Sequence, residues 1–141
     1  MTSELQTGVP NGKQAPQSLR ILMAEDNQIN QRVGKLILQR AGYVIDLVSD
    51  GHEAVEAHRS QPYDLILMDC QMPTMDGFEA SRQIRALEIR QPVIIAVTAN
   101  ALVGERERCL NAGMDDYLSK PFQAEQLVAV VRKWSCQDRQ S

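Results

Sequence analysis

The sequence predicts one α/β domain built around a parallel sheet, and two observations support this class. From Leu19 onward, five short apolar runs alternate with segments in which apolar residues recur at helical spacing. Such alternation is typical of βα units that share a parallel sheet. The chain has 141 residues, of which 43% are hydrophobic and 23% are charged, enough for a single domain with its own core.

Five strands are expected, and their composition predicts their places in the sheet. They cover residues 19–24, 43–48, 64–68, 93–97 and 116–119. The first, third and fourth are almost wholly apolar, as central strands covered on both faces are. The second alternates apolar and polar residues and the fifth is short and polar, so we expect both at the edges. The resulting order, 2-1-3-4-5, is that of a flavodoxin-like (βα)5 three-layer sandwich.

Helices are expected between the strands. They cover residues 28–40, 51–60, 78–90, 102–112 and 123–134. In the first helix, four residues form one apolar stripe: Ile29, Val33, Leu36 and Ile37. Residues 104–108, GERER, leave the fourth helix with few apolar anchors. We therefore expect that helix to move at little cost, as an output surface requires.

Composition excludes several classes of protein. Fifteen basic and eighteen acidic residues give a net charge of −3 with no basic block, so no nucleic-acid-binding surface is expected. No apolar run approaches the length of a membrane span. The three cysteines lack CxxC spacing, which favours a reducing compartment, the cytoplasm, over a disulfide framework. Cys70 is expected to be a small buried residue, and His52 and His58 to lie on the surface.

The domain is expected to cover residues 19–134. Residues 1–18 are rich in Gly, Pro, Ser, Asn and Gln, which is typical of a flexible leader or interdomain linker. Residues 135–141, SCQDRQS, are expected to be a short C-terminal tail.

Candidate functional residues lie at the carboxyl ends of four of the five expected strands. They are Glu25 and Asp26 after the first strand, Asp69 after the third, Thr98 after the fourth, and Ser119, Lys120 and Pro121 after the fifth. Ligands of such sheets bind beyond the carboxyl ends of the strands, so we expect these groups to converge. We also expect the Lys120–Pro121 peptide bond to be cis, because only an X-Pro bond adopts that form at low cost.

The converging groups suit phosphoryl transfer. Three crowded carboxylates repel one another unless a cation lies among them, and oxygen ligands favour Mg²⁺. Asp69 would then be a nucleophile that forms an acyl phosphate. Mg²⁺ would neutralise one phosphoryl oxygen and the Lys120 ammonium a second, and the Thr98 hydroxyl would donate to a third; alignment and charge neutralisation are what this chemistry needs.

Four motifs carry a family resemblance: AEDN at 24–27, LILMDCQMPTMDG at 65–77, VTAN at 97–100 and YLSKPF at 117–122. In this order and spacing they resemble the CheY-like receiver domain of two-component response regulators, over about residues 19–134. The EDNQINQRV segment and the stretch from residue 101 to 122 are most similar to receivers of hybrid sensor histidine kinases.

The resemblance implies a role for each site residue. Asp69 would be the phosphoacceptor, and Lys120 would bind the phosphoryl group. Mg²⁺, with Mn²⁺ as the alternative, would be held by four groups: the carboxylates of Glu25, Asp26 and Asp69 and the backbone carbonyl of Gln71. Thr98 and Tyr117 would be the switch pair.

The resemblance also implies the partners. The phosphoryl donor would be a histidine kinase or a histidine phosphotransfer protein, and the chain would catalyse only its own phosphorylation and dephosphorylation. The parent protein would be a membrane-bound hybrid kinase, with this chain cytoplasmic, out of contact with the membrane, and monomeric or weakly dimeric. We expect Ile29 and Phe122, at the rim of the cleft, to dock the donor; the alternative is that both point into the core.

Three other functions fit the sequence less well. A flavodoxin-like FMN binder needs a Gly- and hydroxyl-rich loop after the first strand, where this chain has EDNQIN. An aspartyl phosphatase of the haloacid dehalogenase type needs an aspartate at the position of Gln71. A degenerate receiver that serves only as a scaffold would not need the complete set of three carboxylates with Lys120.

Overall fold

The computed structural model describes residues 19–99 and 103–140. The expected leader or linker over residues 1–18 lies outside the described residues, as does Asn100 of the VTAN motif. The elements are β2 (Ile21–Ala24), α2 (Gln28–Arg40), β3 (Ile45–Val48), α3 (Gly51–Ser60), β4 (Leu65–Asp69), α4 (Gly77–Ala86), β5 (Val93–Thr98), α5 (Val103–Asn111), β6 (Asp116–Ser119) and α6 (Ala124–Gln140).

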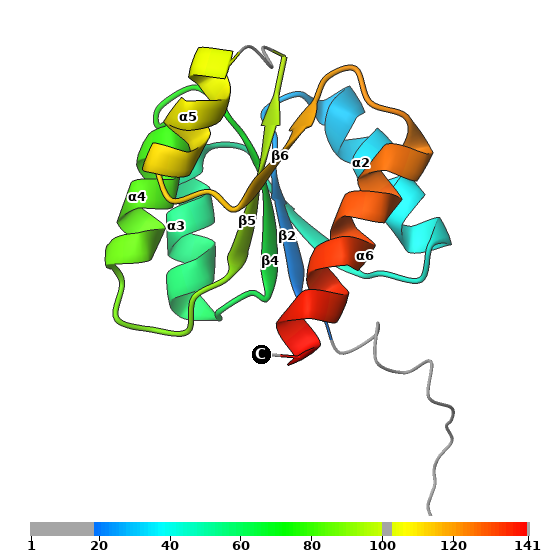
Figure 1. The fold of residues 1–141 in the computed structure, drawn as a ribbon, viewed down its shortest axis with the longest axis horizontal. Helices are drawn as coiled ribbons and strands as arrows, with labels where there is room; N and C mark the ends of the chain where they lie inside the picture. Colours follow the sequence, from blue (N-terminus) through cyan, green and yellow to red (C-terminus); the bar gives the residue numbers. More distant parts are fainter. Residues whose placement is uncertain (1–18, 100–102, 141) are drawn as a thin grey trace, which may run out of the picture.

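The five strands form one parallel sheet in the order β3-β2-β4-β5-β6. This is the predicted order 2-1-3-4-5, with the two more polar strands at the edges. Helices α3, α4 and α5 cover one face of the sheet, and α2 and α6 cover the other (Figure 1). The carboxyl ends of all five strands therefore meet at one edge of the sheet.

Each face of the sheet has its own core. Along the central strands, Leu22, Ile66 and Ile94 face the cluster under α3, α4 and α5. Their neighbours in sequence, Ile21, Leu65 and Ile95, face the cluster under α2 and α6. Because successive side chains of a strand point to opposite faces, both sets must be apolar. This explains why the central strands read as unbroken apolar runs.

The stripe expected on α2 is mostly on the surface. Ile29, Val33 and Leu36 are 70%, 47% and 49% exposed, and the buried residues of the helix are Gly34 and Leu38. At Gly34 the helix lies so close to the sheet that an added Cβ would come within 2.7 Å of the Met23 side chain. The side of α2 that faces the sheet therefore carries Gly34 and Leu38, and most of the apolar stripe lies outside it.

Helices α4 and α6 end several residues away from the positions that the sequence predicted. Helix α4 stops at Ala86, where the Gln91 amide donates to the carbonyls of Ile84 and Leu87 and so satisfies the last turn. Helix α6 continues to Gln140, through the stretch expected to be a tail. No helix within residues 19–99 and 103–140 is long and apolar enough to cross a membrane.

His58 is buried, contrary to the surface position expected from the sequence. It lies in the last turn of α3, at the edge of the sheet opposite the carboxyl ends of the strands. Its Nδ1 accepts from the backbone N–H of Tyr63 at 2.9 Å, and its Nε2 lies 2.8 Å from the carbonyl oxygen of Arg90. These two partners fix a neutral imidazole that donates from Nε2. Burial lowers the pKa of His58 below its usual 6.5.

Candidate functional site

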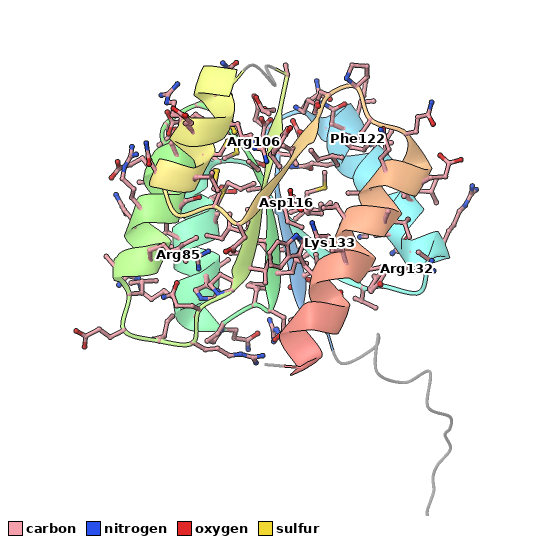
Figure 2. All side chains as sticks on the ribbon, in the orientation of Figure 1. Arg85, Arg106, Asp116, Phe122, Arg132 and Lys133 are labelled. Atoms are coloured by element: carbon pink, nitrogen blue, oxygen red, sulfur yellow. The ribbon has the colours of Figure 1, made fainter. Side chains whose placement is uncertain are left out.

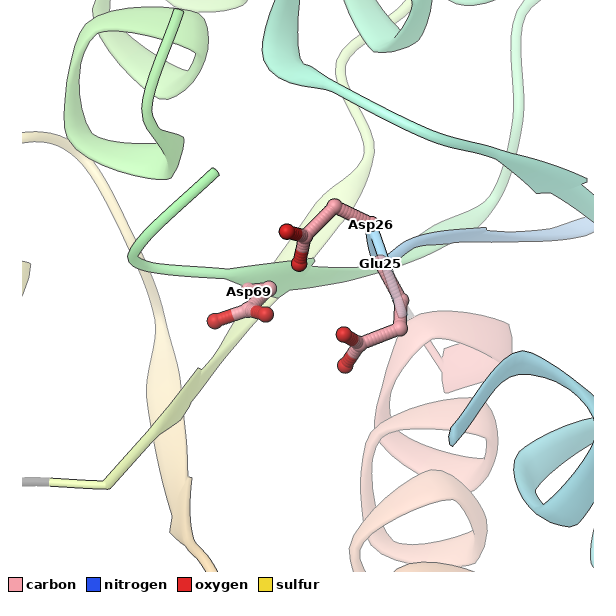
Figure 3. Close-up of side chains that lie close together, drawn as sticks. All are labelled: Glu25, Asp26 and Asp69. Atoms are coloured by element: carbon pink, nitrogen blue, oxygen red, sulfur yellow. The ribbon is translucent and has the colours of Figure 1, made fainter. Parts of the chain in front are cut away.

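Three carboxylates converge at the carboxyl ends of the central strands (Figure 3). Asp69 is the last residue of β4, and Glu25 and Asp26 follow directly after β2. Ligand oxygens of the three side chains all lie within 4.8 Å of one another. Glu25 and Asp69 are buried, whereas Asp26 is exposed. They line a cleft of about 210 Å³ together with Thr98 and Lys120.

Lys120 is the cation of this cleft. Its Nζ lies 3.1 Å from Oδ2 of Asp69 and 3.2 Å from Oε1 of Glu25. It follows β6 directly and precedes Pro121 through a cis peptide bond, as the sequence predicted. The sheet therefore brings together an aspartate and a lysine that lie far apart in the sequence.

Backbone N–H groups hold the other carboxylate oxygens. The N–H of Gln71 donates to Oδ1 of Asp69 at 3.2 Å. The N–H of Asn27 donates to Oε2 of Glu25 at 3.1 Å. Both carboxylates are thus held in place from the protein side, and each also accepts from Lys120.

Burial governs the electrostatics of the site. It raises the pKa of Asp69 from 3.8 to about 6, and the nearby Glu25 carboxylate adds to this. The N–H of Gln71 and the ammonium of Lys120 offset only part of the rise. For Lys120, burial alone would lower the pKa, but the charges of Asp69 and Glu25 outweigh it, so the pKa is raised. Near neutral pH, the ionised Asp69 carboxylate is therefore only partly compensated by Lys120 and the N–H of Gln71.

The donor set fits a hard divalent cation. All three side chains offer oxygen, which Mg²⁺ prefers, and their spacing needs little adjustment for one ion to reach all three. The exposure of Asp26 leaves that side of the cleft open, which suits an ion that keeps several waters. A cation here would also relieve the repulsion between Asp69 and Glu25.

The expected switch residues occupy different places. Thr98 ends β5, is buried and lines the cleft, and its hydroxyl donates to Oε2 of Glu105 at 3.4 Å. Tyr117 lies on β6 and lines a separate hollow of about 70 Å³ beside α5, together with Arg106. The structure thus brings Thr98, but not Tyr117, to the carboxylates.

One of the two expected docking residues, Phe122, lines a second, more apolar pocket. This pocket, of about 420 Å³, is lined by Val33, Phe122 and others, and it shares Glu25 and Lys120 with the acidic cleft. Ile29 is exposed, so the alternative that it points into the core is wrong. Phe122 is half-buried and packs against the core under α2 and α6; Figure 2 shows it after β6, near α2.

The start of α4 presses on the backbone of Asp69. The N–H of Gly77 donates to the carbonyl of Cys70 at 3.1 Å. A Cβ at Gly77 would lie 2.3 Å from the Asp69 carbonyl oxygen, so only glycine allows this approach. On the other side of the same loop, the N–H of Gly51 donates to the carbonyl of Met75 at 2.9 Å. The loop that follows Asp69 is therefore fixed between the starts of α3 and α4.

Sequence reasoning missed several residues of the cleft. Asn27, Asn30 and Ala99 also line it, and the Asn27 side chain caps α2 by accepting from the N–H of Asn30. An asparagine directly before a helical pattern is a recognisable N-cap signal. Cys70 lines the cleft as well, but it is buried, as expected. Burial and the neighbouring Cys109 raise the pKa of its thiol, which disfavours the reactive thiolate.

Comparison with known proteins gives a consistent result. A family model for the response regulator receiver domain matches residues 21–132. The chain is 42% identical to "Hybrid signal transduction histidine kinase B" of Dictyostelium discoideum over an alignment of 127 residues, and the match covers 81% of this chain and 6% of that protein. It is 40% identical to "Sensor protein GacS" of Pseudomonas syringae over an alignment of 132 residues, and the match covers 91% of this chain and 14% of that protein. The chain thus spans only a small part of these relatives.

Solved structures show the same fold. The receiver domain of a sensor histidine kinase from Pseudomonas aeruginosa, with a magnesium ion coordinated in its active-site cleft, matches with a TM-score of 0.78 and 50% identity, covering 84% of this chain and 98% of that one. A second match comes from the Saccharomyces cerevisiae complex between a histidine phosphotransfer signalling protein and the receiver domain of its downstream response regulator. Its TM-score is 0.80 at 30% identity, covering 86% of this chain and 91% of that one.

Proposed function

Because the chain belongs to the response regulator receiver domain family, we propose that Asp69 is its phosphoacceptor and takes a phosphoryl group from a phosphohistidine. The observation that carries this proposal is the position of Asp69. Its buried carboxylate lies 3.1 Å from the Lys120 ammonium and shares a cleft with Glu25 and Asp26.

In the proposed reaction, an oxygen of the Asp69 carboxylate attacks the phosphorus of the donor. The bond between phosphorus and the imidazole nitrogen breaks, and the electron pair returns to the imidazole, which takes up a proton. An acyl phosphate remains on Asp69. Lys120 turns from the carboxylates to a phosphoryl oxygen, and the Thr98 hydroxyl donates to another. Alignment and charge neutralisation are what this transfer asks of the protein.

Mg²⁺ is the proposed cofactor, with Mn²⁺ as the alternative. Glu25, Asp26 and Asp69 would hold it with their carboxylates, and Gln71 with its backbone carbonyl. When bound, the ion supplies positive charge to the phosphoryl oxygens. The magnesium ion in the cleft of the Pseudomonas aeruginosa receiver supports this assignment.

The proposed donor is a histidine phosphotransfer protein or a histidine kinase, docked over α2. Its histidine must reach Asp69, so the donor has to cover the rim of the cleft. There Ile29 and Val33 are exposed, and the pocket at Val33 and Phe122 offers space for an apolar side chain. Exposed apolar patches beside polar clefts often mark such interfaces. The yeast complex of a receiver with a phosphotransfer protein supports this choice of partner.

The chain is further proposed to be the receiver segment of a hybrid histidine kinase, catalysing only its own phosphorylation and dephosphorylation. The named relatives, which are themselves histidine kinases or sensor proteins, support this origin. Phosphorylation would draw the Thr98 hydroxyl toward Asp69 and let the Tyr117 ring move inward, which would shift the surface formed by β5 and α5.

Labelling with radioactive acetyl phosphate or a phosphorylated phosphotransfer protein tests the proposal. We expect a base-labile label on the wild-type chain that requires Mg²⁺ and disappears with a chelator. Asp69→Asn should remain unlabelled, while Asp76→Asn, which alters a nearby aspartate that caps α4, should label normally. Labelling of Asp69→Asn to the level of the wild type would contradict the assignment.

A further inference from the structure

Helix α5 is held in place by few contacts. Of its side chains from Gly104 to Asn111, only Cys109 is buried. Cys109 contacts Cys70, next to the proposed acceptor, and the Arg108 guanidinium lies 4.0 Å from the centre of the Phe78 ring. With so little apolar burial, single polar contacts of α5 can decide where the helix rests.

Two consecutive residues of α5 contact the proposed switch pair. Glu105 accepts from the Thr98 hydroxyl at 3.4 Å. The Arg106 guanidinium lies over the Tyr117 ring, 5.6 Å from its centre, within the range of a cation–π interaction. Figure 2 shows Arg106 on α5, on the side of the helix toward β6.

The Tyr117 ring is the contact that orients Arg106. Among the residues that the structure describes, no carboxylate lies within ion-pair distance of this guanidinium. Two aspartates line the same hollow, and both have other partners: Asp115 pairs with Arg85, and Asp116 accepts from the Trp134 indole at 2.7 Å and pairs with Lys133. Without an acidic partner among residues 19–99 and 103–140, Arg106 keeps its charge available for the ring.

We propose that Arg106 restrains the switch: it holds the half-buried Tyr117 ring in its place beside α5 and so sets how much of the protein is active before phosphorylation. This inference rests on the proposed function. When the ring moves inward it leaves the guanidinium, so the contact stabilises only the resting conformation. A group that binds one of two conformations shifts the equilibrium by its differential affinity. An exposed cation–π contact corresponds to about a two- to fivefold shift.

Titration with beryllofluoride, a phosphoryl mimic, at fixed Mg²⁺ tests the restraint. The readout is the NMR signal of the Tyr117 and Leu118 amides, and the measured quantity is the concentration at half conversion. For Arg106→Ala we expect this midpoint to fall about two- to fivefold. Arg106→Lys, which keeps the charge, should fall between Arg106→Ala and the wild type. Glu107→Ala, an exposed position on the same helix, should match the wild type.

Repeating the Arg106 substitution in a Tyr117→Leu variant makes the test specific for the contact with the ring. In Tyr117→Leu, which lacks the aromatic ring, replacing Arg106 by alanine should leave the midpoint unchanged, as a double-mutant cycle requires for a pairwise contact. An unchanged midpoint in Arg106→Ala alone, or an equal change in the Tyr117→Leu background, would overturn the restraint while leaving the proposed function intact. A wild-type chain that fails to respond to beryllofluoride would overturn both.

Discussion

The carboxyl group of Asp69 is costly to the folded protein at neutral pH. Its pKa of about 6, compared with 3.8 in an unperturbed aspartate, corresponds to about 3 kcal/mol of lost stability once the group is ionised. The contribution of a group whose folded pKa is raised is fully present below the unfolded value. It is lost as the pH rises through the folded value.

Asp69→Asn should therefore be more stable than the wild type when no divalent cation is present. We expect a free energy of unfolding about 1–2 kcal/mol higher at pH 7.5, because the amide removes the cost of a buried charge. The gain is smaller than the full cost, because the amide also gives up the charged contact with Lys120. The difference should shrink toward pH 5, where the wild-type carboxyl is protonated. Urea unfolding at the two pH values measures it.

Magnesium supplies the control for this prediction. Added Mg²⁺ should raise the free energy of unfolding of the wild type, because it binds the folded state, and should raise that of Asp69→Asn much less. A variant less stable than the wild type at pH 7.5 without Mg²⁺ would show that Asp69 stabilises the fold.

Whether the position of a side chain could be predicted from the sequence depends on the structural feature that places it. Glu25, Asp69 and Lys120 were predictable because a parallel sheet carries all strand ends to one edge, whatever the packing around them. The burial of His58 and the contact between Arg106 and Tyr117 were not. Both depend on how a helix is rotated against its neighbours, which apolar spacing specifies only loosely when the helix has few apolar residues.

Helix α2 shows the same limit at the scale of an element. Its bounds, Gln28 to Arg40, were predicted correctly, because Asn27 marks its start and the apolar spacing runs to its end. Its orientation was not, because Gly34 and Leu38 face the sheet while Ile29 and Val33 lie outward. An apolar stripe that faces solvent costs stability unless another surface covers it, which is why we assign this face to the phosphoryl donor.

The docking assignment predicts a difference between donors. Ile29→Ala and Phe122→Ala should each slow transfer from a phosphohistidine protein, with a loss in affinity of about tenfold for a typical interface residue. Transfer from acetyl phosphate, which needs no docking surface, should be almost unchanged. Rates of label uptake from the two donors give the comparison.

Val44 provides a matched control for docking, because it is 67% exposed and lies before the edge strand β3, away from the rim of the cleft. Val44→Ala should transfer from both donors like the wild type. If Ile29→Ala and Phe122→Ala lose activity equally with both donors, the substitutions have damaged the site itself and the docking assignment fails.

At the scale of the whole molecule, two titratable groups at opposite ends of the strands change the stability with opposite sign on acidification. Asp69 adds stability as the pH falls through about 6. His58 has a lowered pKa, so its contribution is present above 6.5 and is lost as the pH falls through its folded value. We therefore expect these two contributions to oppose each other between pH 7.5 and pH 5, so that their combined effect on stability is smaller than the larger of the two.

Removing one group at a time should expose the other. Asp69→Asn should lose stability steadily on acidification, because only the His58 contribution remains. His58→Asn, whose side-chain oxygen can still accept from the N–H of Tyr63, should gain stability over the same range. The slope of the free energy of unfolding against pH is the readout, so a uniform loss in either variant does not matter. Parallel slopes for the two variants would contradict the assignment.

The contact of Gly77 with the backbone of Asp69 also gives the molecule a stiff side and a compliant side. Toward α3 and α4 the acceptor loop has no room to retreat, because the start of α4 touches the carbonyl of Asp69 itself. On the side of α5, the contacts are between side chains: Glu105 accepts from Thr98, and Arg106 lies over the Tyr117 ring. Crowding produced by a bulky, charged group on Asp69 would then be relieved on the side of α5. If Asp69 is phosphorylated as proposed, the close contact at Gly77 on one side of the acceptor would direct the resulting change in volume and charge toward α5.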